Sequence, residues 1–114
     1  METALKLGHG SVAEHAVFTF AVEGISRACS HQLVRHRLAS YCQQSQRTVK
    51  PNGAVCPEMS EEARNVFEVS TALSESAYWK LIDLGVPKED ARYVLPEATK
   101  TSLVVTMNGR ELRH

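Results

Sequence analysis

Hydrophobic side chains alternate with other residues along two stretches of the chain, and a period of two predicts β-strands. The first stretch covers residues 15–22, where one face would carry Ala16, Phe18, Phe20 and Val22. We expect this strand to end at Gly24, since glycine interrupts strands. The second stretch covers residues 100–107, where Leu103, Val105 and Met107 alternate with Ser102 and Thr106.

A three-and-four spacing of apolar residues predicts helices around these strands. The longest would begin after Ser60, a favourable N-cap residue, and end at Gly85. Its apolar residues are expected to form one buried face: Ala63, Val66, Phe67, Ala77, Tyr78, Leu81 and Leu84. Shorter helices are predicted over residues 2–7, 26–37 and 87–94 and from Asn108 onward. The second of these would bury Ala28, Leu33 and Val34.

This order of elements, with loops at residues 9–11 and 48–58, predicts a mixed α and β fold. The chain is long enough for a single domain, residues 1–114, with a modest core. It begins in helix-forming residues and stops in helix-forming residues 111–114, whereas chain ends are usually polar and frayed. We therefore expect the chain to be a piece of a longer protein.

Composition and charge narrow the class of protein. Hydrophobic residues make up 43% and charged residues 23%, and the formal net charge is zero, as in ordinary soluble proteins. A zero net charge gives no overall attraction to nucleic acid or to an anionic membrane. The sequence shows no long apolar run and no signal-peptide pattern, so a cytoplasmic location is expected. Neither a disulfide framework nor a metal site is expected, because Cys29, Cys42 and Cys56 form no C-x-x-C pair and the histidines lack ligand spacing.

The segment from Gln32 to Arg47 concentrates side chains that can do chemistry. Its sixteen residues include three arginines, one histidine, two serines and four glutamines. Arginine donates paired charged hydrogen bonds to phosphates and carboxylates, and hydroxyls and amides suit a nucleotide base. From these residues alone three interpretations stay open: a site for an anionic small molecule, a solvated basic helix end, or a nucleic-acid patch. The last lacks the interleaved aromatic residues that stack on single strands.

The spacing within this segment resembles the signature of the flavin-dependent thymidylate synthases. That signature reads R-H-R-x-x-S-x-x-x-x-S-x-R, and every fixed position is filled, by Arg35, His36, Arg37, Ser40, Ser45 and Arg47. Six fixed residues at fixed spacing form a specific motif.

The resemblance to this family extends along most of the chain. Other similar blocks are Gly8-His9 with residues 14–20, residues 85–87 with residues 91–96, and residues 108–112. Two positions depart from the family pattern. Gln43 stands where glutamate is common, which removes a charge, and Thr48 stands where tyrosine is frequent.

The resemblance implies an α+β fold in which mixed helices accompany a small antiparallel sheet. It implies a reductive methylation of dUMP to dTMP, in which methylenetetrahydrofolate supplies the carbon, NADPH supplies the hydride and FAD carries the hydride to the nucleotide. Family members form homotetramers with shared active sites, so dUMP, folate and further copies of the chain are the expected partners. The alternative is a catalytically inactive flavin- or nucleotide-binding module, since a protein can keep a fold without the catalytic activity found on it.

The resemblance also implies a role for individual residues. Contacts to dUMP are expected from Gln32, Leu33, Val34, Arg35, Gln43, Gln44, Ser45, Gln46, Arg47 and Arg92. Contacts to FAD are expected from Ser11, Arg35, His36, Arg37, Gln43, Asn108, Gly109, Arg110 and His114, and a folate contact from His9. The expected catalytic residues are Arg35, Ser45 and Arg47. We interpret Ser45 as a substrate contact, because no base with an orienting acid is evident to activate its hydroxyl.

Overall fold

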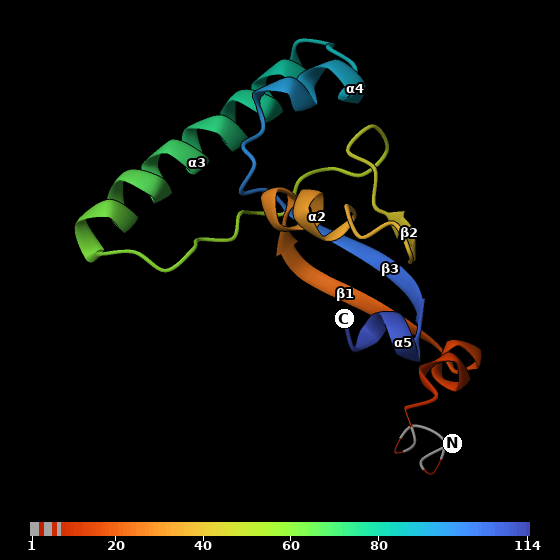
Figure 1. The fold of residues 1–114 in the computed structure, drawn as a ribbon. Helices are drawn as coiled ribbons and strands as arrows, with labels where there is room; N and C mark the ends of the chain where they lie inside the picture. Colours follow the sequence, from red (N-terminus) through yellow and green to blue (C-terminus); the bar gives the residue numbers. More distant parts are fainter. Residues whose placement is uncertain (1–2, 4–5, 7) are drawn as a thin grey trace.

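The computed structural model describes residues 3, 6 and 8–114 of the chain, and Figure 1 shows its ribbon. The elements are η1 (Gly10–His15), β1 (Val17–Ser26), α2 (Arg27–Leu33), β2 (Ser40–Gln43), α3 (Glu61–Asp83), α4 (Lys88–Ala91), η2 (Arg92–Val94), β3 (Lys100–Asn108) and α5 (Gly109–Leu112). Helices accompany one small antiparallel sheet, which confirms the expected α+β class. The helix predicted over residues 2–7 lies largely outside the described residues.

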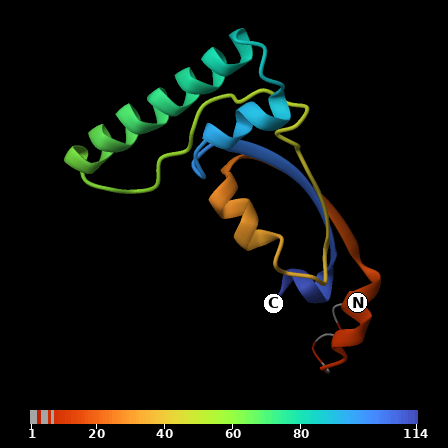
Figure 2. The same ribbon diagram turned by 90° about the horizontal axis from the view of Figure 1, so that it is seen from above.

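The sheet has three antiparallel strands in the order β1-β3-β2. β1 runs along β3 from the pair Val17–Asn108 to the pair Ser26–Lys100, and Figure 2 shows both strands curving around the side on which α2 lies. The alternation predicted for β3 is confirmed, since Leu103 and Val105 are buried. The pattern does not predict β2, whose four residues Ser-Tyr-Cys-Gln show no clear alternation. These residues form a strand because they pair with the second edge of β3.

Gly24 lies within β1, so the prediction that the strand ends there is wrong. The backbone of Gly24 has a φ of 69°, and the register against β3 shifts between Val22 and Ile25. This is a β-bulge, in which a glycine takes the left-handed conformation and pairing resumes beyond it. The strand therefore continues to Ser26, whose hydroxyl accepts the Cys29 N–H at 3.1 Å and caps α2 as predicted.

α2 ends at Leu33, four residues before the predicted end at Arg37. The carbonyl oxygen of His36 accepts a hydrogen bond from the Tyr41 hydroxyl at 2.9 Å. The Arg35 and His36 N–H groups bond to the Gln32 and Leu33 carbonyls at 3.3 and 3.2 Å, three residues back and not four, so the chain leaves the α-helix in a tighter turn that leads into β2. The predicted burial is also wrong for Ala28, which is exposed, while Leu33 and Val34 are half-buried. The buried residue of α2 is Ser30.

α3 has the predicted bounds but not the predicted buried face. Its N-cap is confirmed, since the Ser60 hydroxyl accepts the Ala63 N–H at 3.2 Å, and Gly85 follows its end with a φ of 88°. Only Tyr78 is buried among its residues. Phe67 and Leu81 are half-buried, and Ala63, Val66, Ala77 and Leu84 are exposed, as are Val69 and Leu73.

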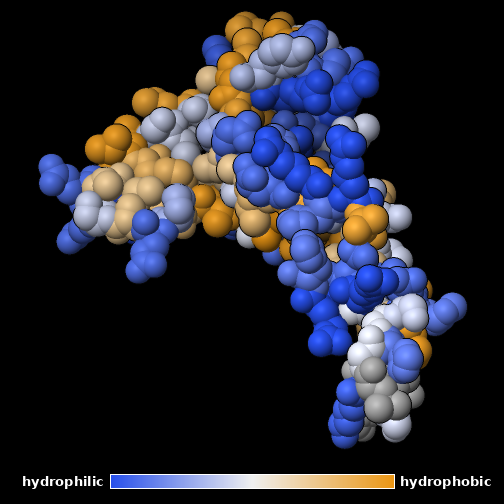
Figure 3. Space-filling model, viewed as in Figure 1, coloured by the Kyte–Doolittle hydropathy of each residue, from blue (hydrophilic) through white to orange (hydrophobic). Residues whose placement is uncertain are grey.

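The exposed face of α3 follows from the elongated shape of the chain. The radius of gyration is 19.0 Å, whereas a compact domain of this length has about 13 Å. α3 projects from the sheet as an arm and packs on α4 and η2 (Figure 1). Apolar atoms lie open along this arm in Figure 3. In the part of the chain that the structure describes, no helix is long and apolar enough to cross a membrane.

Candidate functional site

The R-H-R-x-x-S-x-x-x-x-S-x-R motif, residues 35–47, is divided by β2. Arg35, His36 and Arg37 precede this strand, and residues 44–47 follow it. Antiparallel pairing puts Ser40 opposite Thr106, near α5, and Gln43 opposite Leu103, nearer the start of β3. Because a strand rises about 3.3 Å per residue, the two parts of the motif are separated by roughly 10 Å or more. The predicted site residues therefore form two groups, one at each end of β2.

The first group surrounds α5 and η1. A cavity of about 600 Å³ there is lined by Gly10, Ala13, Glu14, Leu38, Arg110, Glu111, Arg113 and His114. A second cavity of about 230 Å³ is lined by Leu33, His36, Leu38, Ala39, Tyr41, Met107, Glu111, Leu112 and His114. The two share Leu38, Glu111 and His114, so they adjoin. Three of the predicted cofactor residues, His36, Arg110 and His114, are brought together here.

Other predicted cofactor residues of this group build its backbone. The Asn108 side chain accepts the Glu111 N–H at 2.9 Å and caps α5. Gly109 donates its N–H to the Ala16 carbonyl at 2.7 Å, and a Cβ at this position would lie 3.1 Å from the Ala13 carbonyl oxygen. Asn108 and Gly109 thus hold α5 against η1. The Asn108 side chain is occupied by the cap of α5, and the close approach of Ala13 leaves little room for a side chain at position 109.

Residues 9–11 are not the loop that the sequence predicts. Gly10 and Ser11 belong to the 3-10 helix η1, whose first turn is closed by the Val12 N–H and the His9 carbonyl at 3.2 Å. The side chains of His9 and Ser11 are exposed beside the larger cavity, at the N-terminal end of η1, and neither lines it.

Six residues that line the larger cavity were not predicted as site residues: Gly10, Ala13, Glu14, Leu38, Glu111 and Arg113. Glu14 forms an ion pair with Arg110, so an anionic ligand at Arg110 would compete with that carboxylate. Two signals in the sequence could have identified two of them. Glu14 lies in one of the blocks that resemble the family, and Arg113 is a cation just after a short helix. Leu38 carries no such signal, and only the packing of the chain puts it there.

The second group lies where β2 ends. Gln44 continues the sheet by donating its N–H to the Ser102 carbonyl at 2.9 Å. The chain then turns: the Ser45 hydroxyl accepts the Arg47 N–H at 3.2 Å, and the Ser45 carbonyl accepts the Val49 N–H at 2.9 Å. Gln44 lines a cavity of about 300 Å³, and Gln44, Ser45 and Gln46 line a much smaller hollow beside it. No described residue gives the Ser45 hydroxyl a histidine or carboxylate partner.

The three motif arginines, Arg35, Arg37 and Arg47, have exposed side chains. The backbone N–H of Arg35 is held by the Gln32 carbonyl at 3.3 Å. Arg92 lies apart from them in η2, where its Nε donates to the Glu89 carbonyl at 2.9 Å and its guanidinium lies over the Tyr93 ring. One contact joins this region to the turn after β2, from Lys88 Nζ to the Thr48 carbonyl at 3.4 Å.

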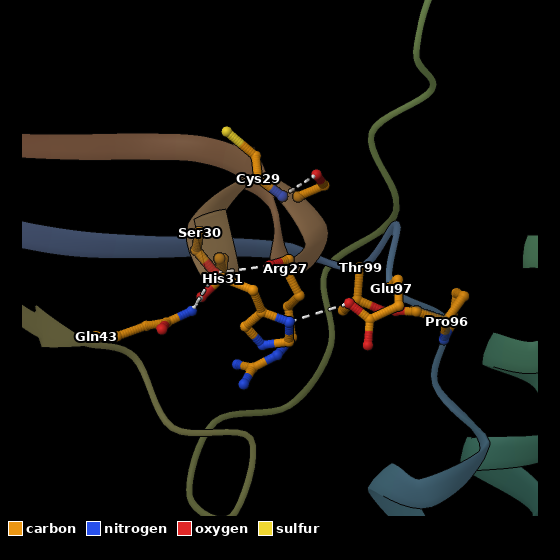
Figure 4. Close-up of polar contacts among 10 residues, drawn as sticks. Arg27, Cys29, Ser30, His31, Gln43, Pro96, Glu97 and Thr99 are labelled. Atoms are coloured by element: carbon orange, nitrogen blue, oxygen red, sulfur yellow. Dashed lines mark hydrogen bonds and ion pairs between the residues drawn. The ribbon is translucent and has the colours of Figure 1, made fainter. Parts of the chain in front are cut away.

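The sequence predicts Gln43 as a ligand contact. In the structure its half-buried side chain lies at the end of β2 and points toward α2 and β3. Its amide nitrogen donates to the Ser30 hydroxyl at 2.7 Å and to the Thr101 hydroxyl at 3.3 Å. Figure 4 shows this contact beside the ion pair between His31 and Glu97, which join at 3.1 Å.

The residues around α5 fit a phosphate-bearing dinucleotide such as FAD. Arg110, Arg113 and His114 line the larger cavity together with Glu14 and Glu111; guanidinium groups bind pyrophosphate oxygens through paired hydrogen bonds, which Arg110 would make in exchange for its ion pair with Glu14. The adjoining cavity is mostly apolar, with Leu33, Met107 and Leu112 in its wall, which suits a ring system. Among the described residues, no group of three or more histidines, cysteines or acids could hold a metal ion.

Comparisons with known proteins agree with these features. The model of the family described as thymidylate synthase complementing protein matches residues 1–114. A flavin-dependent thymidylate synthase of Geobacter sulfurreducens is 54% identical over 100% of this chain and 52% of its own length. Proteins of the same name from Sulfurisphaera tokodaii and Pyrococcus furiosus are 48% and 49% identical, each over 96% of this chain and 44% and 49% of their own lengths. The chain spans about half the length of the curated relatives it matches.

Proposed function

The chain belongs to the thymidylate synthase complementing protein family, and from this premise we propose that it supplies nucleotide- and flavin-binding residues to a flavin-dependent thymidylate synthase. The reaction is the reductive methylation of dUMP to dTMP, with methylenetetrahydrofolate as carbon donor, NADPH as reductant and FAD as cofactor. One observation carries the proposal: the motif is folded into two groups at the two ends of β2, where His36 lines the cavity of about 230 Å³ and Ser45 lines the small hollow after the strand.

Each group has a main task in this proposal, and Arg35 of the first group contacts both dUMP and FAD. Arg47 and Arg35 bind the phosphate of dUMP through charged hydrogen bonds, and Gln44, Ser45 and Gln46 hold the nucleotide beside the turn. His36, Arg37, Arg110 and His114 hold FAD at the α5 end, aided by the backbone that Asn108 and Gly109 fix.

The redox chemistry belongs to the bound FAD, which can accept and pass on a hydride. The protein residues bind, orient and neutralise charge. Ser45 contacts the substrate, because its hydroxyl has no base beside it. His9, exposed at the start of η1, is the proposed folate contact.

The shape of the chain supports a homotetramer with shared sites. Val66, Val69 and Leu73 of α3, and Leu84 directly after it, are between 62% and 69% exposed, and apolar surface of this kind is normally covered by a partner. In such an assembly the exposed arginines of both groups would lie next to residues of neighbouring copies of the chain. Sedimentation velocity tests this, and a monomer at tens of micromolar would contradict it. We propose a cytoplasmic location.

The visible absorption spectrum of the chain with added FAD, before and after dUMP, tests the function. A bound-flavin band that shifts on adding dUMP supports a joint site. The variant Arg47→Ala should abolish the shift, whereas Arg64→Ala, which removes an exposed arginine of α3, should preserve it. A folded chain that binds no flavin would contradict the proposal.

An inactive binding module built on the same fold is the second candidate. It predicts flavin and dUMP binding without formation of dTMP, which a turnover assay measures directly. A nucleic-acid binder would instead show affinity that falls steeply with salt and little preference for dUMP over other phosphates.

A further inference from the structure

A small polar network joins α2, β2 and β3 directly before the turn that carries Ser45 and Arg47. Ser30 is fully buried in α2, and its hydroxyl donates to the Arg27 carbonyl at 2.9 Å. The Gln43 amide nitrogen donates to the same hydroxyl at 2.7 Å and to the buried Thr101 hydroxyl at 3.3 Å. In Figure 4 the amide nitrogen of Gln43 points at Ser30, and its oxygen points away.

The direction of these hydrogen bonds requires a donor at position 43. A serine hydroxyl has one proton, and that proton is used on the Arg27 carbonyl. The Ser30 oxygen can therefore only accept from Gln43. An amide nitrogen carries two protons, one for Ser30 and one for Thr101, whereas a carboxylate carries none. A glutamine at position 43 therefore satisfies the network. An ionised glutamate would put a carboxylate oxygen, which can only accept, next to the accepting Ser30 oxygen in a partly buried environment.

The network sets where the next residues lie. Gln43 is the last residue of β2, and the Gln44 N–H is then fixed on the Ser102 carbonyl. The turn that follows is closed by its own hydrogen bonds through Ser45. Its place relative to the end of α2, and so to Arg35, depends on what ties β2 to α2. Among the hydrogen bonds of the described residues, the one from Gln43 to Ser30 joins β2 to α2 directly; an indirect connection runs through β3 and the segment before it, since the Arg27 and Ala28 N–H groups bond to the Thr99 and Glu97 carbonyls.

We infer that Gln43 is a positioning residue: its amide locks the turn of Ser45 and Arg47 to α2 and β3, so that Arg47 lies at a fixed distance from Arg35. The amide oxygen is the only polar atom of the side chain left for a ligand, which therefore meets an acceptor. That dUMP is the ligand rests on the proposed function, but the network itself does not.

Gln43→Met tests the inference, because methionine has a similar length and no charge but cannot donate. Its affinity for dUMP, measured by calorimetry, should fall about tenfold, the loss expected when one well-made hydrogen bond no longer orders the turn. Flavin affinity should change less than twofold, because the α5 group lies at the other end of β2. A merely structural role would lower both affinities together with the melting temperature, and that result would overturn the inference.

A double-variant cycle sharpens the test. Ser30→Ala removes the acceptor, so it should weaken dUMP binding by itself, but it should add little in the Gln43→Met background because the contact is already lost. Additive effects of the two substitutions on dUMP affinity would overturn the inference.

A ligand-free readout separates this inference from the proposed function. Hydrogen exchange of the Arg47 amide, which is held by Ser45, should be at least tenfold faster in Gln43→Met than in the unchanged chain. If the unchanged chain binds no dUMP, the proposed function fails while this exchange measurement still decides the role of Gln43. Equal exchange rates in the two chains would overturn it.

Discussion

The same chemical change at two tyrosines should move the stability of the chain in opposite directions. Tyr78 is fully buried in α3, edge-on to the Trp79 ring at 5.2 Å between centroids. Its hydroxyl has no hydrogen-bond partner among the described residues. The Tyr41 hydroxyl, in contrast, donates to the His36 carbonyl at 2.9 Å. We therefore expect Tyr78→Phe to stabilise the chain and Tyr41→Phe to destabilise it.

The size of both effects follows from these contacts. A buried hydroxyl without a partner costs about 1–3 kcal/mol. We take the lower end of this range, about 1 kcal/mol, for Tyr78→Phe, because many of the neighbouring side chains of α3 are exposed. Tyr41→Phe loses a hydrogen bond with a net worth of about 1 kcal/mol. Since 1 kcal/mol shifts the melting temperature of a chain this size by roughly 4 °C, the two variants should differ by roughly 8 °C.

The stability gain at Tyr78 should depend on pH. Burial raises the pKa of the Tyr78 hydroxyl above its ordinary value of 10.0. Above that ordinary value the unfolded chain releases the proton while the folded chain keeps it. The stability linked to this group is therefore complete below about pH 10 and is lost as the pH rises through the raised pKa. Tyr78→Phe lacks this loss, so its advantage should grow in alkaline solution.

Urea unfolding followed by far-ultraviolet circular dichroism, at neutral pH and above about pH 10, measures both effects. A Tyr78→Phe chain less stable than the unchanged chain by about 1 kcal/mol would refute the reasoning, because the hydroxyl would then have a partner in solution. An advantage that stays constant with pH would refute the linkage argument separately.

Substitutions at three further positions test the turns and the site. Ser60→Ala should lower the free energy of unfolding by about 1 kcal/mol and Ser60→Gly by less, because the Ser60 hydroxyl caps α3; thermal melts measure both, and equal losses would argue against capping. Gly24→Ala should cost about 1 kcal/mol and Gly24→Asn less, because φ is 69° there; an Ala variant as stable as the unchanged chain would show that the bulge relaxes. Arg47→Lys should weaken dUMP binding about tenfold, since lysine lacks the guanidinium fork, and an unchanged affinity in calorimetry would show that the fork is not used.

Sequence patterns determined the elements whose cause is local. The Ser26 and Ser60 caps, the end of α3 before Gly85 and the alternation in β3 all depend on residues within one turn or one strand of each other. The family could also be identified from the sequence, because the fixed residues of the motif lie in one continuous segment, residues 35–47.

Tertiary structure decided the features that depend on distant residues. β2 exists because β3 offers it an edge, and the segment after Leu33 turns to bring the chain onto that edge, where Tyr41 donates to the His36 carbonyl. The continuation of β1 past Gly24 depends on pairing with β3, which no local pattern reports.

The candidate site shows the same division. Sequence reasoning found the residue types that bind phosphate, and it placed them in one cluster. The fold separates them into two groups at opposite ends of β2, and it turns Gln43 inward to Ser30. The apolar face of α3 was predicted to be buried and is open. Periodicity shows which residues share a face of a helix, but burial depends on a second surface to cover that face, and only the assembled structure shows whether one is present.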